Sequence, residues 1–206
     1  TKPIIVLPCT KMLSDEELYK ATLPFITKTG DAALEINVSD EFPAPHVGPE
    51  YSGIALGDDG EPVCVDTSMN MSSADVKKAL MELMPLIKER LKYLTEAAEM
   101  VHFLFTEPAV PAADQIIPKK LDLAKTKEVL EASKEFVKAL PNLDHEGSEA
   151  LAREMAEKLG VKLGDFMMPI RMAVTGSRVS PPLMGSILIL GVERSLERIE
   201  RTLQTL

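Results

Sequence analysis

Aromatic side chains are scarce in this sequence, whose 206 residues hold no tryptophan, three tyrosines and six phenylalanines. Strand-rich sandwiches and barrels draw on aromatic and β-branched residues, so this scarcity disfavours them. Leucine, alanine and methionine are abundant instead, and these residues favour helices. Because 45% of the side chains are hydrophobic, the chain can bury a substantial core. We therefore predict a mainly α fold of helical bundles, with a small β-containing insertion near the N-terminus.

Long apolar runs and paired cysteines are also missing. No apolar stretch approaches the roughly 20 residues needed to cross a bilayer, and the opening TKPIIVLPCTK is too short and too interrupted by proline for a signal peptide. Cys9 and Cys64 stand alone, without the paired spacing of a zinc site. We expect a cytoplasmic protein with reduced thiols, no bound metal and no membrane partner.

Positive charge is in short supply, since the formal net charge is -9. A nucleic acid is usually met by a basic face, so the overall charge argues against such a partner. The charge is unevenly distributed, however. Residues 1–75 hold 4 Lys and Arg against 13 Asp and Glu, residues 76–150 hold 11 against 13, and residues 151–206 hold 8 against 6. The last third is the only positive one, and any anionic partner is expected to bind there.

The N-terminal third divides into a helix and an insertion. Residues 1–30 include LSDEELYKATLPFI, where Ser14 can cap a short helix that begins with three acidic residues and ends near Gly30. Residues 31–73 are acidic and rich in proline and glycine. Within them a DDG turn separates GIAL from PVCV, which predicts a β-hairpin.

Residues 74–140 are predicted to form a helical subdomain. From Ser73 onwards, apolar residues follow the three-and-four spacing of a buried helical stripe as far as Phe105. Because proline lacks the backbone donor, Pro85 predicts two abutting helices, the second beginning at Pro85. A loop with three prolines follows. A further helix is predicted to bury Val129, Leu130, Phe136, Val137 and Leu140, and PNLDHEG marks a candidate domain boundary.

Residues 141–206 are predicted to form a second subdomain of four short helices. Ser148 opens the first and Gly160 closes it, and Gly176, in a positive-φ position, closes the next. Ser180 is predicted to cap the third helix, with Pro181 as its first residue. Gly191 ends that helix before VERSLERIERTL forms a final charged one. The predicted buried side of the third helix consists of Leu183, Ile187, Leu188 and Leu190.

A recognisable catalytic constellation is absent from the sequence. His46, His102 and His145 have no nucleophile partner in a known motif, and GIALGDDG follows neither the dinucleotide-binding nor the P-loop order of glycines. The acidic clusters are typical of helix starts and solvated turns. Taken alone, the chain is predicted not to be a catalyst.

The stretch PIRMAVTGSRVSPPL, Pro169 to Leu183, remains as the candidate binding site. The end of one helix, a bend and the free amides of the next helix can form a concave site for an anionic or planar group. Arginine forks suit phosphates and base edges, and guanidinium planes stack on unpaired bases. On local grounds alone, Ser180 is equally explained as a helix cap, Leu183 as core, and Arg171 and Arg178 as surface charges.

Three stretches carry a resemblance to a known family. GVKLGDFMMPIRMAVTGSRVSPPLMGSILILGVERSLERIERTL resembles the C-terminal, anticodon-binding end of bacterial-type glutamyl-tRNA synthetases. ALMELMPLIKERLKYLTEAAEMVHFLFTE and LSDEELYKATLPFI are similar to helical segments further upstream in that family. The pattern P-x-R-x-A-x-T-G, then S/T-P, then L-G, is specific in combination because no general rule of folding demands it. Residues 31–73 have no counterpart that we can place in the usual pattern of the family.

The resemblance implies which residues contact the anticodon of a glutamate-accepting tRNA. Arg90 matches the arginine that faces the first anticodon base, and Ser180, Pro181 and Leu183 match the turn beside the last base. The implied anticodon-binding residues are Arg90, Arg153, Arg171, Ser180, Pro181 and Leu183. Without the resemblance, Arg90 and Arg153 would not be singled out.

The resemblance also implies a larger parent enzyme that attaches glutamate to its tRNA with ATP and Mg²⁺. The H-I-G-H-like and K-M-S-K-S-like motifs of the family's catalytic domain do not occur here, so the expected partners are the tRNA and that catalytic domain. We expect a monomer. The alternative is a free-standing helical protein derived from such a synthetase, with residues 31–73 as a surface for protein interaction. Whether the parent charges glutamine tRNA as well stays open.

Overall fold

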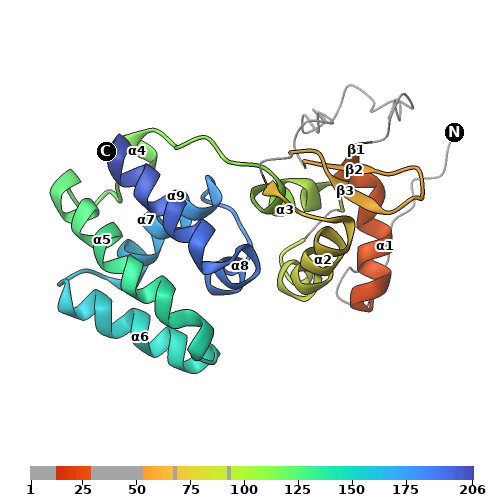
Figure 1. Ribbon diagram of the computed structural model, residues 1–206. Coiled ribbons are helices and arrows are strands. Elements are labelled where there is room, and N and C mark those ends of the chain that lie inside the picture. The colour runs from red at the N-terminus through yellow and green to blue at the C-terminus, as the bar shows by residue number, and fades with distance from the viewer. Residues whose placement is uncertain (1–12, 29–52, 67–68, 92–93) are drawn as a thin grey trace, which may run out of the picture. The chain divides into compact units, whose positions relative to one another are not determined.

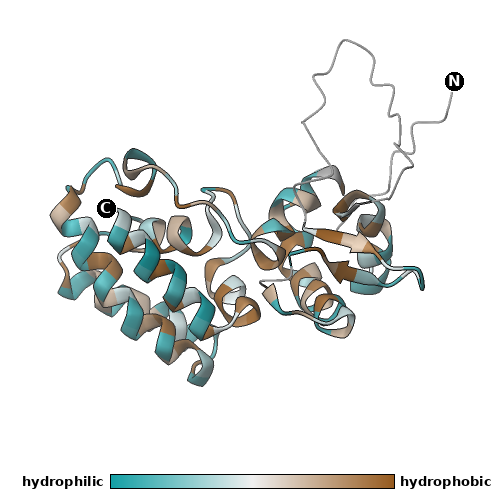
Figure 2. Cartoon of the chain, turned by 45° about the horizontal axis from the view of Figure 1, so that its top comes forward, coloured by the Kyte–Doolittle hydropathy of each residue, from teal (hydrophilic) through white to brown (hydrophobic). Residues whose placement is uncertain are grey.

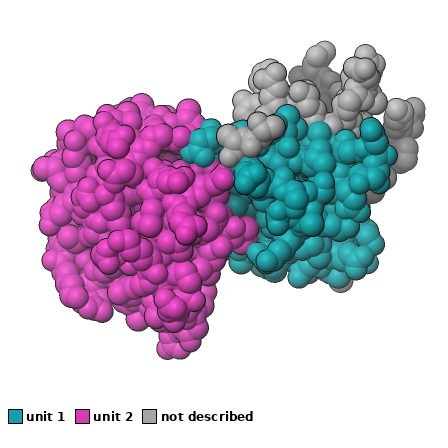
Figure 3. Space-filling model, in the orientation of Figure 1, with its two compact units in different colours: residues 1–107 teal, residues 108–206 magenta. Residues whose placement is uncertain are grey.

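The computed structural model describes residues 13–28, 53–66, 69–91 and 94–206 (Figure 1). Contacts divide the chain into two compact units, residues 1–107 and 108–206 (Figure 3). Helices make up most of the described part of both units, which confirms the predicted mainly α fold. The sequence predicted boundaries at residues 31, 74 and 141, whereas contacts place one boundary at residue 107. Helix α5 (Leu123–Ala139) accordingly packs against elements of unit 2.

Unit 1 is built around helices α1 (Asp15–Ile26), α2 (Ser73–Lys88) and α3 (Ala97–Phe105), with the short 3₁₀ helix η3 (Leu94–Glu96) before α3. Helix α1 packs against α2, η3 and α3, and α2 also packs against α3. Their facing apolar side chains are removed from water, which is the main favourable term in folding. The fully buried members of this core include Leu18, Ile26, Leu80, Leu83, Ile87, Val101 and Phe105.

A small three-stranded sheet joins the helices of unit 1. Strands β2 (Ile54–Leu56) and β3 (Pro62–Cys64) are antiparallel, with Ala55 opposite Val63, so the predicted hairpin across the DDG turn is confirmed. Strand β1 (Thr27–Lys28) pairs parallel to β2 and was not predicted. Helix α1 ends at Ile26 rather than near Gly30, because the backbone of Thr27 is already extended and begins β1. Residues 31–52 of the predicted insertion lie outside the described residues.

Pro85 lies inside α2, so the predicted break at this residue is wrong. The proline is exposed, which leaves the carbonyl that lacks its helical donor near solvent rather than in the core. Leu83, Met84 and Ile87 on either side of it are buried, and their packing outweighs the cost of the missing hydrogen bond. The helix ends at Lys88 instead, and the chain re-enters helical structure at Leu94.

Unit 2 contains helices α4 (Ala113–Ile116), α5, α6 (His145–Lys158), α7 (Leu163–Thr175), α8 (Leu183–Leu190) and α9 (Val192–Thr205), with the 3₁₀ helix η4 (Leu140–Asn142) after α5. Helix α7 packs against α5, α6 and α9, and α5 packs against α9. Figure 2 shows bands of hydrophilic and hydrophobic residues along these helices. In the core the rings of Phe136 and Phe166 meet edge to face with centroids 5.8 Å apart. The predicted burial of Val129, Leu130, Phe136, Val137 and Leu140 is confirmed.

Most helix ends of unit 2 follow the predicted punctuation. Gly160 and Gly176 adopt positive φ angles of 66° and 70° beyond the ends of α6 and α7, as expected. Ser148 does not open α6, however, because the carboxylate of Asp144 accepts from the Gly147 N–H at 2.7 Å and caps the helix one turn earlier. The Ser148 hydroxyl donates instead to the carbonyl of Asp144 at 2.7 Å. Within the described residues, no helix combines the length and the apolar character needed to cross a membrane.

Two capping boxes in unit 1 predict a dependence of stability on pH. Hydrogen bonds from the amide and hydroxyl of Ser14 hold the pKa of Glu17 below its ordinary value, and those from the hydroxyl and amide of Ser72 do the same for Asp75. A lowered folded-state pKa stabilises the fold above the ordinary carboxyl pKa, and the contribution disappears as the pH falls through the folded-state value. The stability difference between wild type and the double variant Ser14→Ala/Ser72→Ala should therefore shrink as the pH falls below about 4.

Unfolding followed by circular dichroism between pH 7 and pH 3 measures this difference. Ser73→Ala, one residue beyond the cap of α2, is the matched control and should show no such pH dependence. A gap between the double variant and wild type that stays constant over the whole range would contradict the capping role.

Candidate nucleic-acid interface

Residues 176–182 form the joint between α7 and α8. Gly176 ends α7 with its N–H donating to the carbonyl of Met172 at 3.0 Å. A Cβ atom built on Gly176 would lie 2.8 Å from the Cβ of Pro108, closer than real Cβ atoms approach another carbon. The positive φ and this close approach together require glycine at the start of the joint.

The side chains of Thr175, the last residue of α7, and of Ser177 stabilise the first half of the joint by hydrogen bonds. The Thr175 hydroxyl lies within donating distance of two carbonyls, that of Arg171 at 2.9 Å and that of Ser177 at 3.1 Å. The same oxygen lies 3.3 Å from the Ser177 N–H, and the Ser177 hydroxyl accepts from the Val179 N–H at 3.1 Å. The turn is therefore a hydrogen-bonded structure that continues from the last turn of α7.

Arg171 connects α7 to the second half of the joint. Its Nη1 donates to the hydroxyl of Ser180 and, at 3.0 Å, to the carbonyl of Pro181. The side chain is half-buried, so its guanidinium is oriented by the turn while part of the residue remains accessible to solvent. The turn therefore fixes the position of this guanidinium through two acceptors.

Ser180 does not cap α8, and Pro181 is not its first residue. The helix begins at Leu183, its N-cap residue is Pro182, and no side chain makes a capping bond there. The Ser180 hydroxyl lies 3.0 Å from the Pro181 carbonyl and accepts from Arg171, so it serves the turn rather than the helix. Ser180 is 3% exposed. Two consecutive prolines delay the helix because each restricts the residue before it to an extended backbone.

Most of the side chains that point inward around the start of α8 are buried in the core of unit 2. Leu183 and Ile187 are buried as predicted, and Pro181 is buried as well. Leu188, predicted to be buried, is 48% exposed, and Leu190 is only partly buried. The buried face is completed instead by Ser186, whose hydroxyl donates to the Pro182 carbonyl at 3.0 Å.

The solvent side of the joint presents Arg178 and Val179. The Arg178 side chain is exposed, and its Nη2 lies 3.3 Å from the carbonyl of Gln115 at the C-terminal end of α4. Val179 is 60% exposed. The joint thus offers an exposed cation and an exposed apolar side chain, a combination that suits phosphate and base contacts.

The structure does not bring every predicted site residue into the joint. Arg153 is an exposed residue of α6, and its guanidinium lies 3.6 Å from Glu149 on the same helix. Arg90 belongs to unit 1, where it is exposed two residues after the end of α2, and its N–H donates to the Ile87 carbonyl at 2.8 Å. Arg171, Ser180, Pro181 and Leu183 are the members that meet at one place.

Arg198 and Arg201 on α9 hydrogen-bond to backbone carbonyls at or near the joint, and the sequence did not single them out. Nη1 of Arg198 donates to the carbonyl of Val174 at 2.6 Å, and Nη2 of Arg201 donates to that of Pro108 at 2.7 Å. Arg198 is only 1% exposed. Arg198 lies three residues after Ser195 and four before Thr202, and all three are buried on one face of α9 although each is polar, so the apolar pattern did not indicate its burial.

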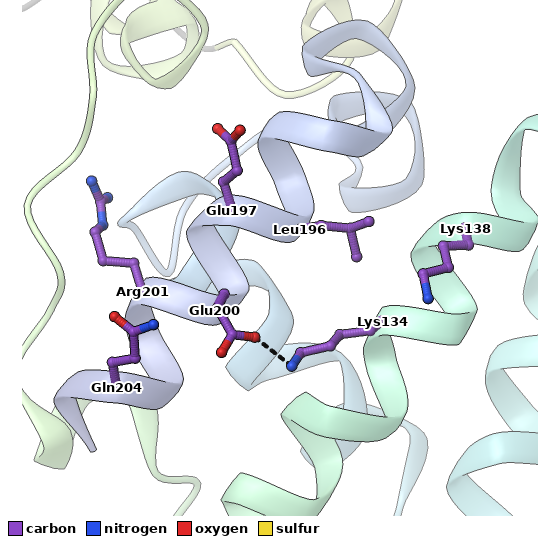
Figure 4. A pocket seen from close by; sticks show the side chains of 7 residues that line it. All are labelled: Lys134, Lys138, Leu196, Glu197, Glu200, Arg201 and Gln204. Atoms are coloured by element: carbon purple, nitrogen blue, oxygen red, sulfur yellow. Dashed lines mark hydrogen bonds and ion pairs between the residues drawn. The ribbon is translucent and has the colours of Figure 1, made fainter.

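A shallow hollow of about 420 Å³ lies between α5 and α9 (Figure 4). Lys134 pairs there with Glu200 at 2.5 Å and with Glu131 at 2.8 Å, and its hydrogen bonds to Glu131 and Glu200 raise the pKa of its ammonium group. Both ion pairs are partly exposed; the Lys134–Glu200 pair joins α5 to α9, whereas the Lys134–Glu131 pair lies within α5. The lining residues are Lys134, Lys138, Leu196, Glu197, Glu200, Arg201 and Gln204.

The residues described in the two units include no metal-binding cluster. They contain no group of three or more His, Cys, Asp or Glu side chains arranged to hold a metal ion. The ring nitrogens of His102 lie 3.0 and 3.1 Å from the hydroxyl of Thr106, and the Cys64 thiol lies 3.3 Å from the Phe105 carbonyl. His46 and Cys9 lie outside the described residues.

Comparison with known proteins identifies relatives over most of the chain. The pattern of the anticodon-binding domain family matches residues 57–203. Glutamate-tRNA ligase of Treponema denticola is 44% identical over 191 residues, which cover 92% of this chain and 34% of the relative. The Treponema pallidum (strain Nichols) ligase is 39% identical, covering 93% and 33%. The chain thus spans about a third of the length of the curated relatives it matches.

A solved structure supports the fold. The crystal structure of a glutamate tRNA ligase from Elizabethkingia meningosepticum, in complex with its amino acid, aligns with a TM-score of 0.50 and 18% identity, covering 96% of this chain and 30% of that chain.

The match to the Treponema denticola ligase covers 92% of this chain, which is possible only if the match includes part of residues 31–73. Part of the acidic insertion therefore has a counterpart in that relative.

Proposed function

This chain belongs to the anticodon-binding domain family, and we propose that it is the part of a glutamate-tRNA ligase that selects tRNA by its anticodon. The observation that carries the proposal is the joint after α7. There Nη1 of the half-buried Arg171 is bonded to Ser180 and Pro181, and the exposed Arg178 and Val179 belong to the same connection between α7 and α8. A fixed guanidinium fork can hydrogen-bond to the edge of an unpaired base, and it cannot be replaced by the flexible point charge of lysine.

One residue at the joint contacts the RNA, and three others hold that residue and the turn in place. Arg171 reads a base, while Ser180 and Pro181 hold its guanidinium, and Leu183 anchors the turn in the core. Because Ser180, Pro181 and Leu183 are buried, their contribution to the last anticodon base is the shape and backbone of the turn. Arg153 on α6 contacts the phosphate backbone of the anticodon loop, and Arg90 in unit 1 contacts the first anticodon base. Arg178 pairs with a phosphate of the anticodon loop.

The parent enzyme would supply the chemistry. It activates glutamate with ATP and Mg²⁺ as an adenylate and transfers the glutamyl group to the 3′ end of the tRNA. A cytoplasmic location follows from the proposal, because charged tRNA is consumed by the ribosome. The partners are one glutamate-accepting tRNA and the catalytic domain of the same enzyme, in a monomer.

Binding of tRNA transcripts tests the proposal directly. The 206-residue chain should bind a glutamate tRNA transcript more tightly than the same transcript with a changed anticodon. By analogy with base contacts in DNA, one lost bidentate contact costs about 1–3 kcal/mol, or roughly ten- to a hundredfold in affinity. Affinity is measured by fluorescence anisotropy at two salt concentrations, because phosphate contacts weaken steeply with salt whereas discrimination between anticodons weakens less. Equal affinity for all anticodons at low salt would reject the proposal in favour of a protein-interaction role.

A further inference from the structure

Arg198 is the largest fully buried side chain among the described residues. It projects from α9, and its Nη1 donates to the carbonyl of Val174 on α7 at 2.6 Å. Removing a guanidinium from water is costly, and well-packed apolar residues often replace buried charged groups without loss of stability. The group that this guanidinium hydrogen-bonds should therefore indicate what the cation does.

The acceptor of this bond lies at the C-terminal end of α7. Val174 is the second-last residue of the helix, and the last four carbonyls of a helix have no partner within it. The helix dipole also places partial negative charge there, so a cation is favoured at this end. Arg198 therefore closes the last turn of α7 from a neighbouring helix.

That last turn leads directly into the joint. Thr175 follows Val174, and its hydroxyl lies within hydrogen-bonding distance of both Arg171 and Ser177. Arg171 lies one turn before Val174, and its Nη1 holds Ser180 and Pro181. The stretch from Arg171 to Pro181 is thus held from within by Arg171 and from α9 by Arg198.

We infer that Arg198 is a positioning residue, which sets the orientation of the Arg171 guanidinium toward RNA by fixing the end of α7. The inference rests on the proposed function. If the end of α7 frays, the carbonyl of Arg171 and the turn at Gly176 move together, and the guanidinium loses its fixed direction. Binding through phosphates would continue, because it needs only charge near the RNA. Discrimination between anticodons would be lost.

Arg198→Met tests this inference, because methionine fills much of the same space without a charge or a donor. The variant should fold with a melting temperature close to that of wild type. Its preference for the unchanged anticodon over a changed one should fall at least fivefold, while its affinity for the changed transcript stays the same. Arg198→Lys, which keeps a donor without the fork, should lie between the two. A folded Arg198→Met protein with full preference for the unchanged anticodon would overturn the inference.

Ser195→Ala is the matched control. Ser195 is also a buried polar residue of α9, but its hydroxyl donates at 2.8 Å to the Gly191 carbonyl before the same helix. The control should keep the full preference for the unchanged anticodon. If wild type itself shows no preference for the unchanged anticodon, the proposed function is wrong. If wild type and Arg198→Met show the same preference, the proposed function stands and only the positioning role of Arg198 is wrong.

Amide hydrogen exchange of the wild-type chain provides a test that does not depend on whether a variant folds. The N–H of Gly176, which donates to Met172, should exchange as slowly as the amides in the middle of α7, because Arg198 prevents local fraying. Exchange of Gly176 at the rate of an exposed loop amide would show that the end of α7 opens freely, and would overturn the inference.

Discussion

The Arg171→Met variant should lose discrimination between anticodons by about 1–3 kcal/mol, roughly ten- to a hundredfold in relative affinity. Two physical effects add in the same direction. The variant lacks the guanidinium fork that we propose reads a base, and it also lacks the Nη1 donor that holds Ser180 and Pro181 in the turn. Anisotropy titrations with unchanged and anticodon-changed glutamate tRNA transcripts measure the effect. Arg171→Lys should behave almost like Arg171→Met, because lysine keeps the charge but not the planar geometry.

Arg153→Met is the matched control for the charge. Arg153 is an exposed arginine of the same unit whose side chain lies near Glu149 on its own helix rather than against the joint. Its removal should weaken binding to all transcripts by a similar factor and reduce the salt dependence, with a smaller effect on discrimination. If Arg171→Met weakens all transcripts equally, as an arginine acting only on phosphates would, the reading role of Arg171 is refuted.

Gly176→Ala should be strongly destabilising, by about 2–5 kcal/mol. A non-glycine residue with a left-handed backbone costs about 1–2 kcal/mol, and forcing an extra methyl group into a packed site costs about 1–3 kcal/mol more. Here the added Cβ would lie 2.8 Å from the Cβ of Pro108, and φ is 70°. Urea unfolding followed by circular dichroism measures the loss. Because the joint begins at this residue, we also expect weaker anticodon discrimination in the fraction that remains folded.

Two other glycines of unit 2 separate the contributions. Gly160 has a similar φ of 66° but no neighbour within 4 Å of an added Cβ, so Gly160→Ala should show the backbone cost alone. Gly164 lies in the first turn of α7 with open space around it, and Gly164→Ala should be neutral or stabilising by up to about 1 kcal/mol. Equal losses for Gly176→Ala and Gly160→Ala would mean that the approach of Pro108 is unimportant.

The elements of this protein whose signals are local were predictable from the sequence. The three-and-four spacing of apolar residues indicated most of the helices, and a serine before acidic residues marked the start of α1. Glycine at the end of α7 indicated a positive φ, which the structure confirms at 70°. The DDG turn indicated the β2–β3 hairpin. Each of these signals works because a side chain or its absence acts on backbone within a few residues of itself.

Predictions failed where a local signal was overridden by contacts with the rest of the molecule. Pro85 should have broken a helix by its own chemistry, but the buried residues around it keep α2 continuous. Ser180 has the chemistry of a cap, yet its hydroxyl is engaged by Arg171 from another helix. In both cases a partner distant in sequence decides the outcome.

The sequence by itself determined that the chain is mainly helical, that α6, α7 and α8 end just before Gly160, Gly176 and Gly191, and that Arg171 lies beside a turn of unusual composition. The tertiary structure alone decided what that arginine holds, that Ser180 and Leu183 support the turn from inside, and that Arg198 closes the end of α7. The physical reason is range. Capping, turn chemistry and helical periodicity act over a few residues, whereas the orientation of a guanidinium depends on acceptors that folding brings next to it from other helices.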